Sequence, residues 1–91
     1  MNYKDIRDIS FEFLPPEDFR EGVHGELHFP NGFGVSVVSH TQSYGGRHGL
    51  FELAVLDSEG RLTYSTPITL DVLGWLDAHE VTQIMRKVQE L

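Results

Sequence analysis

The chain contains no cysteine among its 91 residues. Disulfides, thiolate metal ligands and a cysteine nucleophile are therefore excluded together, and the composition suits a reducing compartment. Lysine and arginine are also scarce, because seven cations stand against 14 acidic residues and the formal net charge is −7. A protein that binds duplex nucleic acid needs clustered cations to meet the phosphates, so we expect no such partner.

Long apolar runs are absent as well. No stretch approaches the roughly 18 apolar residues of a membrane-spanning helix, and the first residues lack the apolar segment of a signal peptide. We therefore expect a cytoplasmic protein with no membrane contact and no cofactor. A chain of 91 residues with 40% hydrophobic content predicts a single domain, residues 1–91, built around one core.

The acidic charge lies on both flanks of the sequence. Residues 1–30 sum to −4 and residues 57–91 to −3, whereas residues 31–56 contain only Arg47 and Glu52 and sum to zero. An acidic surface usually serves to keep a protein in solution. The alternative is attraction to a basic partner.

Alternating apolar and polar residues predict an antiparallel sheet of about five strands in near-sequential, meander-like order. The strands are expected at 9–14, 23–29, 33–39, 50–56 and 61–65. On the first, Ile9, Phe11 and Phe13 should share the inward face. Turns are expected at residues 30–32 and 57–60, where Asn and Gly tolerate the required backbone angles.

The C-terminal residues predict one helix. Asp77 should act as its N-cap, with Glu80 completing a capping box. An apolar stripe at helical spacing follows: Val81, Ile84, Met85, Val88 and Leu91. The preceding residues, 68–76, are expected to form packed irregular chain or a short helical turn, with Trp75 at the edge of the core. The fold class is thus α+β, with the helix packed on one face of the sheet.

The second face of the sheet is expected to be small and mostly apolar. Its residues should be Gly34, Ser36, Val38, Leu50, Ala54 and Leu56. Exposed patches of this kind often mark interfaces. We expect either that residues 1–8 or 66–76 fold over it, or that a second copy of the chain buries it in a homodimer.

Residues 40–49 (HTQSYGGRHG) form the tip between two central strands and concentrate polar groups. Loops held by rigid strands often contain functional residues, and Tyr and Arg are favoured at binding hot spots. We predict these partner-binding residues: His40, Tyr44, Arg47 and His48. The glycine-rich run would also suit an anion nest, although the phosphate-loop pattern G-x-x-x-x-G-K-[ST] is absent. A flexible loop with incidental histidines is the simplest interpretation of this segment.

Chemistry elsewhere finds little support. His24 and His28 lie four residues apart on a strand, roughly 13 Å. They cannot share one zinc when each Zn–N bond is about 2 Å, so we expect polar side chains on a solvated face and no metal site. No serine lies in a G-x-S-x-G motif and no carboxylate pair stands out. We therefore expect no catalytic residue and no enzyme.

Three stretches, NGFGVSVVSH, SYGGRHGLFELAVLDSEGRLTYSTPIT and DVLGWLDAHEV, resemble a group of small uncharacterised proteins encoded by bacteriophages and prophages. The resemblance spans roughly residues 29–81 and rests on the N-G-[FY]-G turn, the S-Y-G-G…G-L-[FWY]-E-L-A-V-L-D hairpin and the T-P-I-T…D-V-[LI]-G-[WY]-L run. It implies a phage accessory protein that acts in the cytoplasm of a bacterial host. Small acidic phage proteins often bind and block a host enzyme or defence complex, so by analogy it favours that class.

The leading hypothesis is therefore a small acidic binding protein that inhibits a host protein by docking through the tip and the second sheet face. The alternative is a small-ligand or nucleotide-binding protein whose tip holds an anion. A metal-dependent enzyme comes third.

Overall fold

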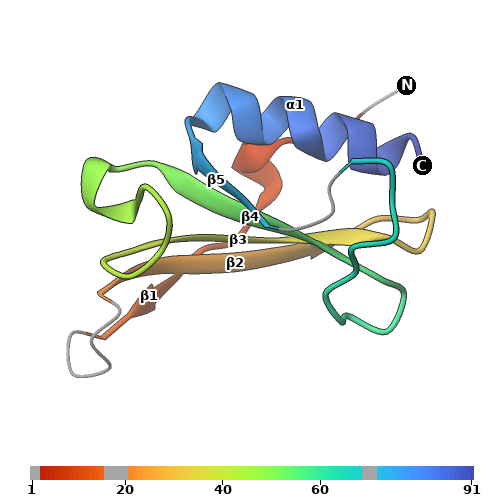
Figure 1. Cartoon of the computed structure of the whole chain (residues 1–91). Coiled ribbons are helices and arrows are strands. Elements are labelled where there is room, and N and C mark those ends of the chain that lie inside the picture. The colour runs from red at the N-terminus through yellow and green to blue at the C-terminus, as the bar shows by residue number, and fades with distance from the viewer. Residues whose placement is uncertain (1–2, 16–20, 69–71) are drawn as a thin grey trace.

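The computed structural model describes residues 3–15, 21–68 and 72–91, which form a five-stranded antiparallel sheet with an α-helix across one face (Figure 1). The strands are β1 (Glu12–Leu14), β2 (Gly22–His28), β3 (Gly34–His40), β4 (Phe51–Leu56) and β5 (Leu73–Leu76), and the helix is α1 (Ala78–Gln89). Strands adjacent in the sheet are adjacent in the sequence. The expected α+β meander with one C-terminal helix is confirmed.

The β2–β3 hairpin is the longest paired unit of the sheet, with seven register pairs. Its turn is where the sequence predicted it. Gly32 has φ +92°, and the Phe29 N–H donates to the Phe33 carbonyl at 2.8 Å. Asn31 accepts from the Phe33 N–H at 3.0 Å and donates through Nδ2 to the Val88 carbonyl at 2.9 Å. The turn residue thus also ties the hairpin to the end of α1.

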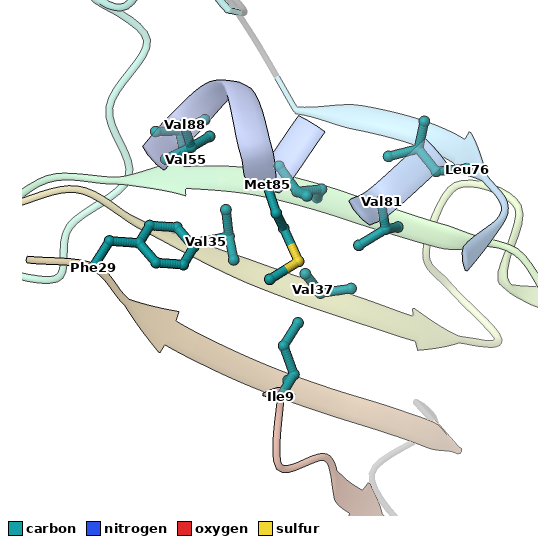
Figure 2. Close-up of a cluster of buried hydrophobic side chains, with 10 residues drawn as sticks. Ile9, Phe29, Val35, Val37, Val55, Leu76, Val81, Met85 and Val88 are labelled. Atoms are coloured by element: carbon teal, nitrogen blue, oxygen red, sulfur yellow. The ribbon is translucent and has the colours of Figure 1, made fainter. Parts of the chain in front are cut away.

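The core lies between α1 and the inward face of the sheet (Figure 2). Its fully buried side chains come from β3, β4 and α1: Val35, Val37, Leu53, Val55, Val81, Met85 and Val88. Register explains the sheet contribution, because Val35 pairs with Val55 and Val37 with Leu53. Residues paired in this way place their side chains on the same face.

Helix α1 begins as predicted. The Asp77 carboxylate accepts from the Glu80 N–H at 2.8 Å, and the Glu80 carboxylate accepts from the Asp77 N–H at 3.1 Å. This reciprocal capping box satisfies two backbone donors at the helix start. The apolar stripe ends at Val88, however, because the helix stops at Gln89 and Leu91 is 37% exposed.

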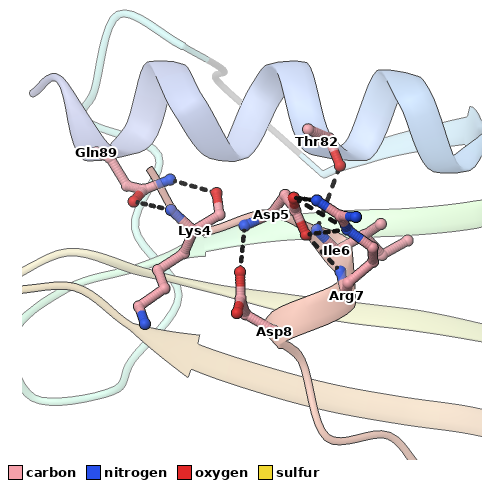
Figure 3. A network of polar contacts seen from close by, with 7 residues as sticks. All are labelled: Lys4, Asp5, Ile6, Arg7, Asp8, Thr82 and Gln89. Carbon is pink, nitrogen blue, oxygen red and sulfur yellow. Dashed lines mark hydrogen bonds and ion pairs between the residues drawn. The ribbon is translucent and has the colours of Figure 1, made fainter. Parts of the chain in front are cut away.

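The N-terminal residues pack along α1 (Figure 3). Gln89 exchanges two hydrogen bonds with the backbone of Lys4, both of 2.8 Å, and the Ile6 N–H donates to Thr82 Oγ1 at 3.2 Å. A short 3-10 helix, η1 (Ile6–Asp8), forms here. Residues 3–8 therefore lie on the helix side of the sheet and do not cover its second face.

The short helix η1 has its own cap. The Asp5 carboxylate accepts from the Arg7 N–H at 2.8 Å, and Asp8 accepts from the Asp5 N–H at 2.8 Å. The Arg7 guanidinium also forms an ion pair with Asp5 at 2.7 Å. Hydrogen bonds from the Arg7 side chain and backbone lower the pKa of Asp5.

The fifth strand is not where the sequence placed it. Residues 61–65 form no strand, and within them Leu62 makes one isolated bridge to Leu56. The fifth strand is instead β5, within the segment 68–76 that was predicted as irregular chain or a helical turn. Its register pairs are Phe51 with Leu76 and Leu53 with Leu73. Two segments thus pair with the edge of β4 that faces away from β3. Strand β5 pairs with its first residues, and Leu62 bridges to Leu56 at its end.

The first strand is shorter than predicted, because β1 begins only at Glu12. Ile9 is buried in the core, and the Phe11 ring packs against Phe51 with centroids 5.9 Å apart. Phe13 does not share their burial and is 88% exposed. Phe13 pairs with Val23 at the far end of the sheet, so the two side chains share the predicted face. At this end of the sheet, however, the Phe13 side chain is left exposed.

The second face is more closed than the sequence suggested. Gly34, Ala54 and Leu56 are buried there, while Ser36, Val38 and Leu50 are half-buried. Among the segments proposed as cover, residues 3–8 pack elsewhere, residues 69–71 lie outside the described residues, and residues 73–76 form β5. The homodimer through this face stays a prediction.

Candidate functional site

The tip between β3 and β4 is a compact turn closed by its own hydrogen bonds. The Ser43 hydroxyl accepts from the His40 N–H and donates to the His40 carbonyl, each at 2.9 Å. A 3-10 helix, η3 (Gly46–His48), follows between two left-handed glycines, Gly45 at φ +86° and Gly49 at φ +75°. These glycines allow the chain to reverse twice within a few residues, because a left-handed backbone carries little penalty without a Cβ.

The tip packs directly on β5. The Trp75 N–H donates to the Tyr44 carbonyl at 3.2 Å. A Cβ added to Gly45 would lie 2.9 Å from Trp75 Cα, and one added to Gly74 would overlap the Tyr44 Cβ. One glycine on each side thus lets the two backbones approach closely. The tip is positioned by β5 as well as by its own hairpin.

Trp75 occupies an unusual backbone position. Its φ of +59° makes it the one non-glycine residue with positive φ in the described part of the chain. A left-handed backbone costs about 1–2 kcal/mol for a residue with a Cβ. Gly74 and Trp75 lie opposite the single residue Glu52, between the two register pairs of β5, which is the arrangement of a β-bulge. Bulges re-aim side chains, and here the indole points outward and is 56% exposed.

The expected place of Trp75 at the core edge is therefore wrong. Alternation within a short apolar run cannot reveal an extra residue in a strand. The available signal was Gly74, because glycine inside a strand-like run indicates a bulge or a close backbone approach.

A shallow hollow of about 210 Å³ lies between the tip and Trp75. It is lined by Thr41, Gln42, Ser43, Tyr44, Gly45, Arg47, His48 and Trp75. Tyr44 is 63% exposed, and the His48 ring packs on the indole with centroids 5.3 Å apart and planes tilted by 36°. We call Tyr44, Arg47, His48 and Trp75 the tip site.

Three of the four residues predicted from the sequence thus come together, joined by Trp75, which the sequence did not suggest as a site residue. His40 does not line the hollow. Its ring Nδ1 accepts from the Gln42 N–H at 3.1 Å, so its place is within the turn.

Arg47 supplies the positive charge of the tip site. Its Nε donates to the Thr41 carbonyl at 3.2 Å, which fixes the orientation of the guanidinium. The other arginines that the structure describes have carboxylate or aromatic partners: Arg7 with Asp5, Arg61 with Asp57 and Glu59, and Arg86 over the Tyr3 ring. Arg47 makes no ion pair or ring contact with any described residue. Glu52, the acidic residue of this region, accepts instead from the Tyr44 N–H at 3.2 Å.

The polar residues of β2 form a separate group on the second face. Glu26 lies between His24 and His28, with N–O distances of 3.7 and 3.8 Å, and His24 Nε2 lies 3.2 Å from Ser36 Oγ. Over residues 3–15, 21–68 and 72–91, no group of three or more His, Asp or Glu side chains is placed to hold a metal ion.

No model of a known protein family matches the chain, and neither curated proteins nor solved structures show significant similarity to it. The resemblance to phage-encoded proteins therefore stays a prediction from the sequence. Within the residues that the structure describes, no helix combines the length and apolar character that crossing a membrane requires.

Proposed function

We propose that this protein is a small binding protein that docks on a partner protein through the tip site. The observation that supports this most is the placement of Trp75, whose strained backbone directs a large aromatic side chain outward with 56% of its surface exposed. Strained residues persist only where the surrounding structure holds them, and they cluster at functional sites. Trp, Tyr and Arg are also the residue types enriched at binding hot spots, and the tip site presents one of each.

The size of the hollow favours a protein partner over a small molecule. Ligand pockets typically measure about 300–1,000 Å³ and enclose most of the ligand. The hollow at the tip is about 210 Å³ and shallow, which suits one inserted side chain. A nucleotide or another anionic ligand is the second candidate, favoured by the guanidinium of Arg47 beside aromatic rings.

The proposed partner is a protein of a bacterial host, and binding would block it. This part of the proposal rests on the resemblance to phage-encoded accessory proteins and on the placement of the exposed groups. It assigns no catalytic residue to the chain.

Affinity capture from a bacterial lysate tests the proposal. A stoichiometric protein partner should be retained by the wild-type protein and lost by the Tyr44→Ala and Arg47→Ala variants. Hot-spot truncations cost about 2 kcal/mol or more, which is about 30-fold in affinity. The matched controls are Tyr64→Ala and Arg61→Ala, because both side chains are exposed and lie outside the tip site.

Binding to the purified partner would then be measured by calorimetry for all four variants. Equal losses for tip and control variants would contradict the proposal. Binding of nucleotides with no protein partner would favour the second candidate.

A further inference from the structure

We infer that the partner segment entering the tip site carries a carboxylate next to an apolar side chain. This inference rests on the proposed docking function and specifies the chemistry of its partner. It follows from the charge and the shape of the tip site, which set two separate requirements.

The charge requirement comes from Arg47. Because its Nε is engaged by the Thr41 carbonyl, the terminal guanidinium nitrogens are oriented and left for a ligand. Two parallel N–H donors match a carboxylate in a bidentate pair, which is the geometry that arginine recognises best.

The shape requirement comes from the two exposed aromatic residues. Tyr44 and Trp75 both line the hollow and are 63% and 56% exposed. A leucine, proline or phenylalanine side chain would bury part of both rings at once. The volume of about 210 Å³ leaves space for one such side chain.

A basic partner segment fits the tip site poorly. Aromatic faces do attract cations, but the Arg47 guanidinium shares the hollow with them. Like charges placed together at an interface oppose binding. The attraction of the acidic chain for basic partners would therefore act on its flanks and not at this site.

The acidic flanks do not exclude a carboxylate here. Residues 31–56 sum to zero charge, with the −4 and −3 of the flanks on either side of them in the sequence. Glu21, whose carbonyl accepts from the Thr41 N–H at 3.2 Å, and Asp77 lie near the tip, whereas exposed charges farther away than the Debye length of about 8 Å are largely screened at physiological salt. The flanks do disfavour a partner that is acidic over a wide area. A partner with one carboxylate on an otherwise neutral or basic surface can pair with Arg47 and is not repelled by the acidic flanks.

A random hexapeptide display library provides the test. Selection on the wild-type protein, after removal of peptides that bind the Trp75→Gly variant, should enrich sequences with Asp or Glu within two positions of Leu, Pro or Phe. The affinity of the best synthetic peptide is then measured from the fluorescence of Trp75, the single tryptophan of the chain. Circular dichroism confirms that each variant is folded.

A double-mutant cycle separates the carboxylate contact from general effects. Replacing the peptide carboxylate by its amide should weaken binding to the wild-type protein at least tenfold, and to the Arg47→Gln variant less than twofold. The Arg61→Gln variant, as control, should behave like the wild type.

We call a peptide tip-dependent when it binds the wild-type protein but not the Trp75→Gly variant. Enrichment of tip-dependent peptides that are basic or lack a carboxylate would overturn the inference and leave the docking function standing. Equal losses on the wild-type and Arg47→Gln proteins would also overturn it. If no tip-dependent peptide is enriched, the inference fails, and the capture experiment decides separately whether the docking function stands.

Discussion

Alanine at Gly45 should destabilise the protein far more than alanine at Gly49, although both glycines have left-handed backbones in the same turn. Their φ angles are +86° and +75°. A Cβ at such a position costs about 1–2 kcal/mol, and the reduced freedom of the unfolded chain returns about 0.4–1 kcal/mol. At Gly49 nothing lies within 4 Å of the new Cβ. The net cost there should be about 1 kcal/mol.

At Gly45 a steric cost is added. The new Cβ would lie 2.9 Å from Trp75 Cα, 3.1 Å from Leu50 Cβ and 3.2 Å from the Trp75 nitrogen. Two of these neighbours are backbone atoms, which cannot rotate away. Overpacking of this kind costs about 1–3 kcal/mol, so Gly45→Ala should cost about 2–4 kcal/mol in total.

Urea unfolding followed by circular dichroism measures both variants, with an unchanged slope showing that the unfolding reaction is the same. For a domain of this size, 1 kcal/mol corresponds to about 4–8 °C in Tm. The fluorescence of folded Gly45→Ala should also differ from that of the wild type, because Trp75 is displaced. Equal destabilisation by the two alanines, with unchanged fluorescence, would refute the packing of the tip on β5.

Three further results are expected. Met85→Ala should lower the free energy of unfolding by about 2–5 kcal/mol, because the side chain is fully buried; a loss below 1 kcal/mol in urea unfolding would contradict this core. Trp75→Gly should cost less than Met85→Ala in the same assay, because glycine relieves the left-handed strain while the indole is only partly buried; a larger cost would mean that the indole is mainly structural. The pKa of Asp57 should lie below 3.8 in carboxyl NMR titrations, because its carboxylate accepts from the backbone N–H groups of Arg61 and Glu59. Its contribution to stability is present above the unfolded value and lost as pH falls through the lower folded value, so Asp57→Asn should weaken the acid dependence of stability below about pH 4; an unchanged acid dependence would contradict the turn geometry.

Local signals in the sequence were sufficient for much of the fold. The capping box of Asp77 and Glu80 involves residues three apart, and the turn at Asn31 and Gly32 closes strands that adjoin it. Each of these features depends on neighbours in the chain, so the residue types indicate it directly. The alternation of β2, β3 and β4 adds the inward face in the same way.

The fifth strand could not be identified in this way. Residues 61–65 alternate as well as a strand should, but strand pairing depends on which segment reaches the edge of β4. There β5 pairs with the first half of β4 after a long connection. Local alternation does not show which of two segments takes an edge.

The difference between local and non-local features also explains which residues of the tip site could be predicted. Tyr44, Arg47 and His48 lie within five residues of one another, so their grouping could be predicted from the sequence. Trp75 joins them only because β5 pairs with β4 and because its bulge turns the indole outward. A non-local pairing and a local irregularity had to combine, and Gly74 signals only the second.

The two parts of the Trp75 indole contribute differently. Trp buries up to about 250 Å², so the part that is not exposed covers roughly 110 Å² and contributes about 2–3 kcal/mol at about 25 cal/mol per Å². That packing, which includes the His48 ring, is enough to offset the backbone strain within the folded chain. The exposed 56% gains nothing from folding. A partner that covered it would remove roughly 140 Å² from water, worth about 3–4 kcal/mol, which is the size of a hot-spot contribution. A smaller apolar residue would retain part of the packing but would lose this contact area, and the tip site is where the chain presents it.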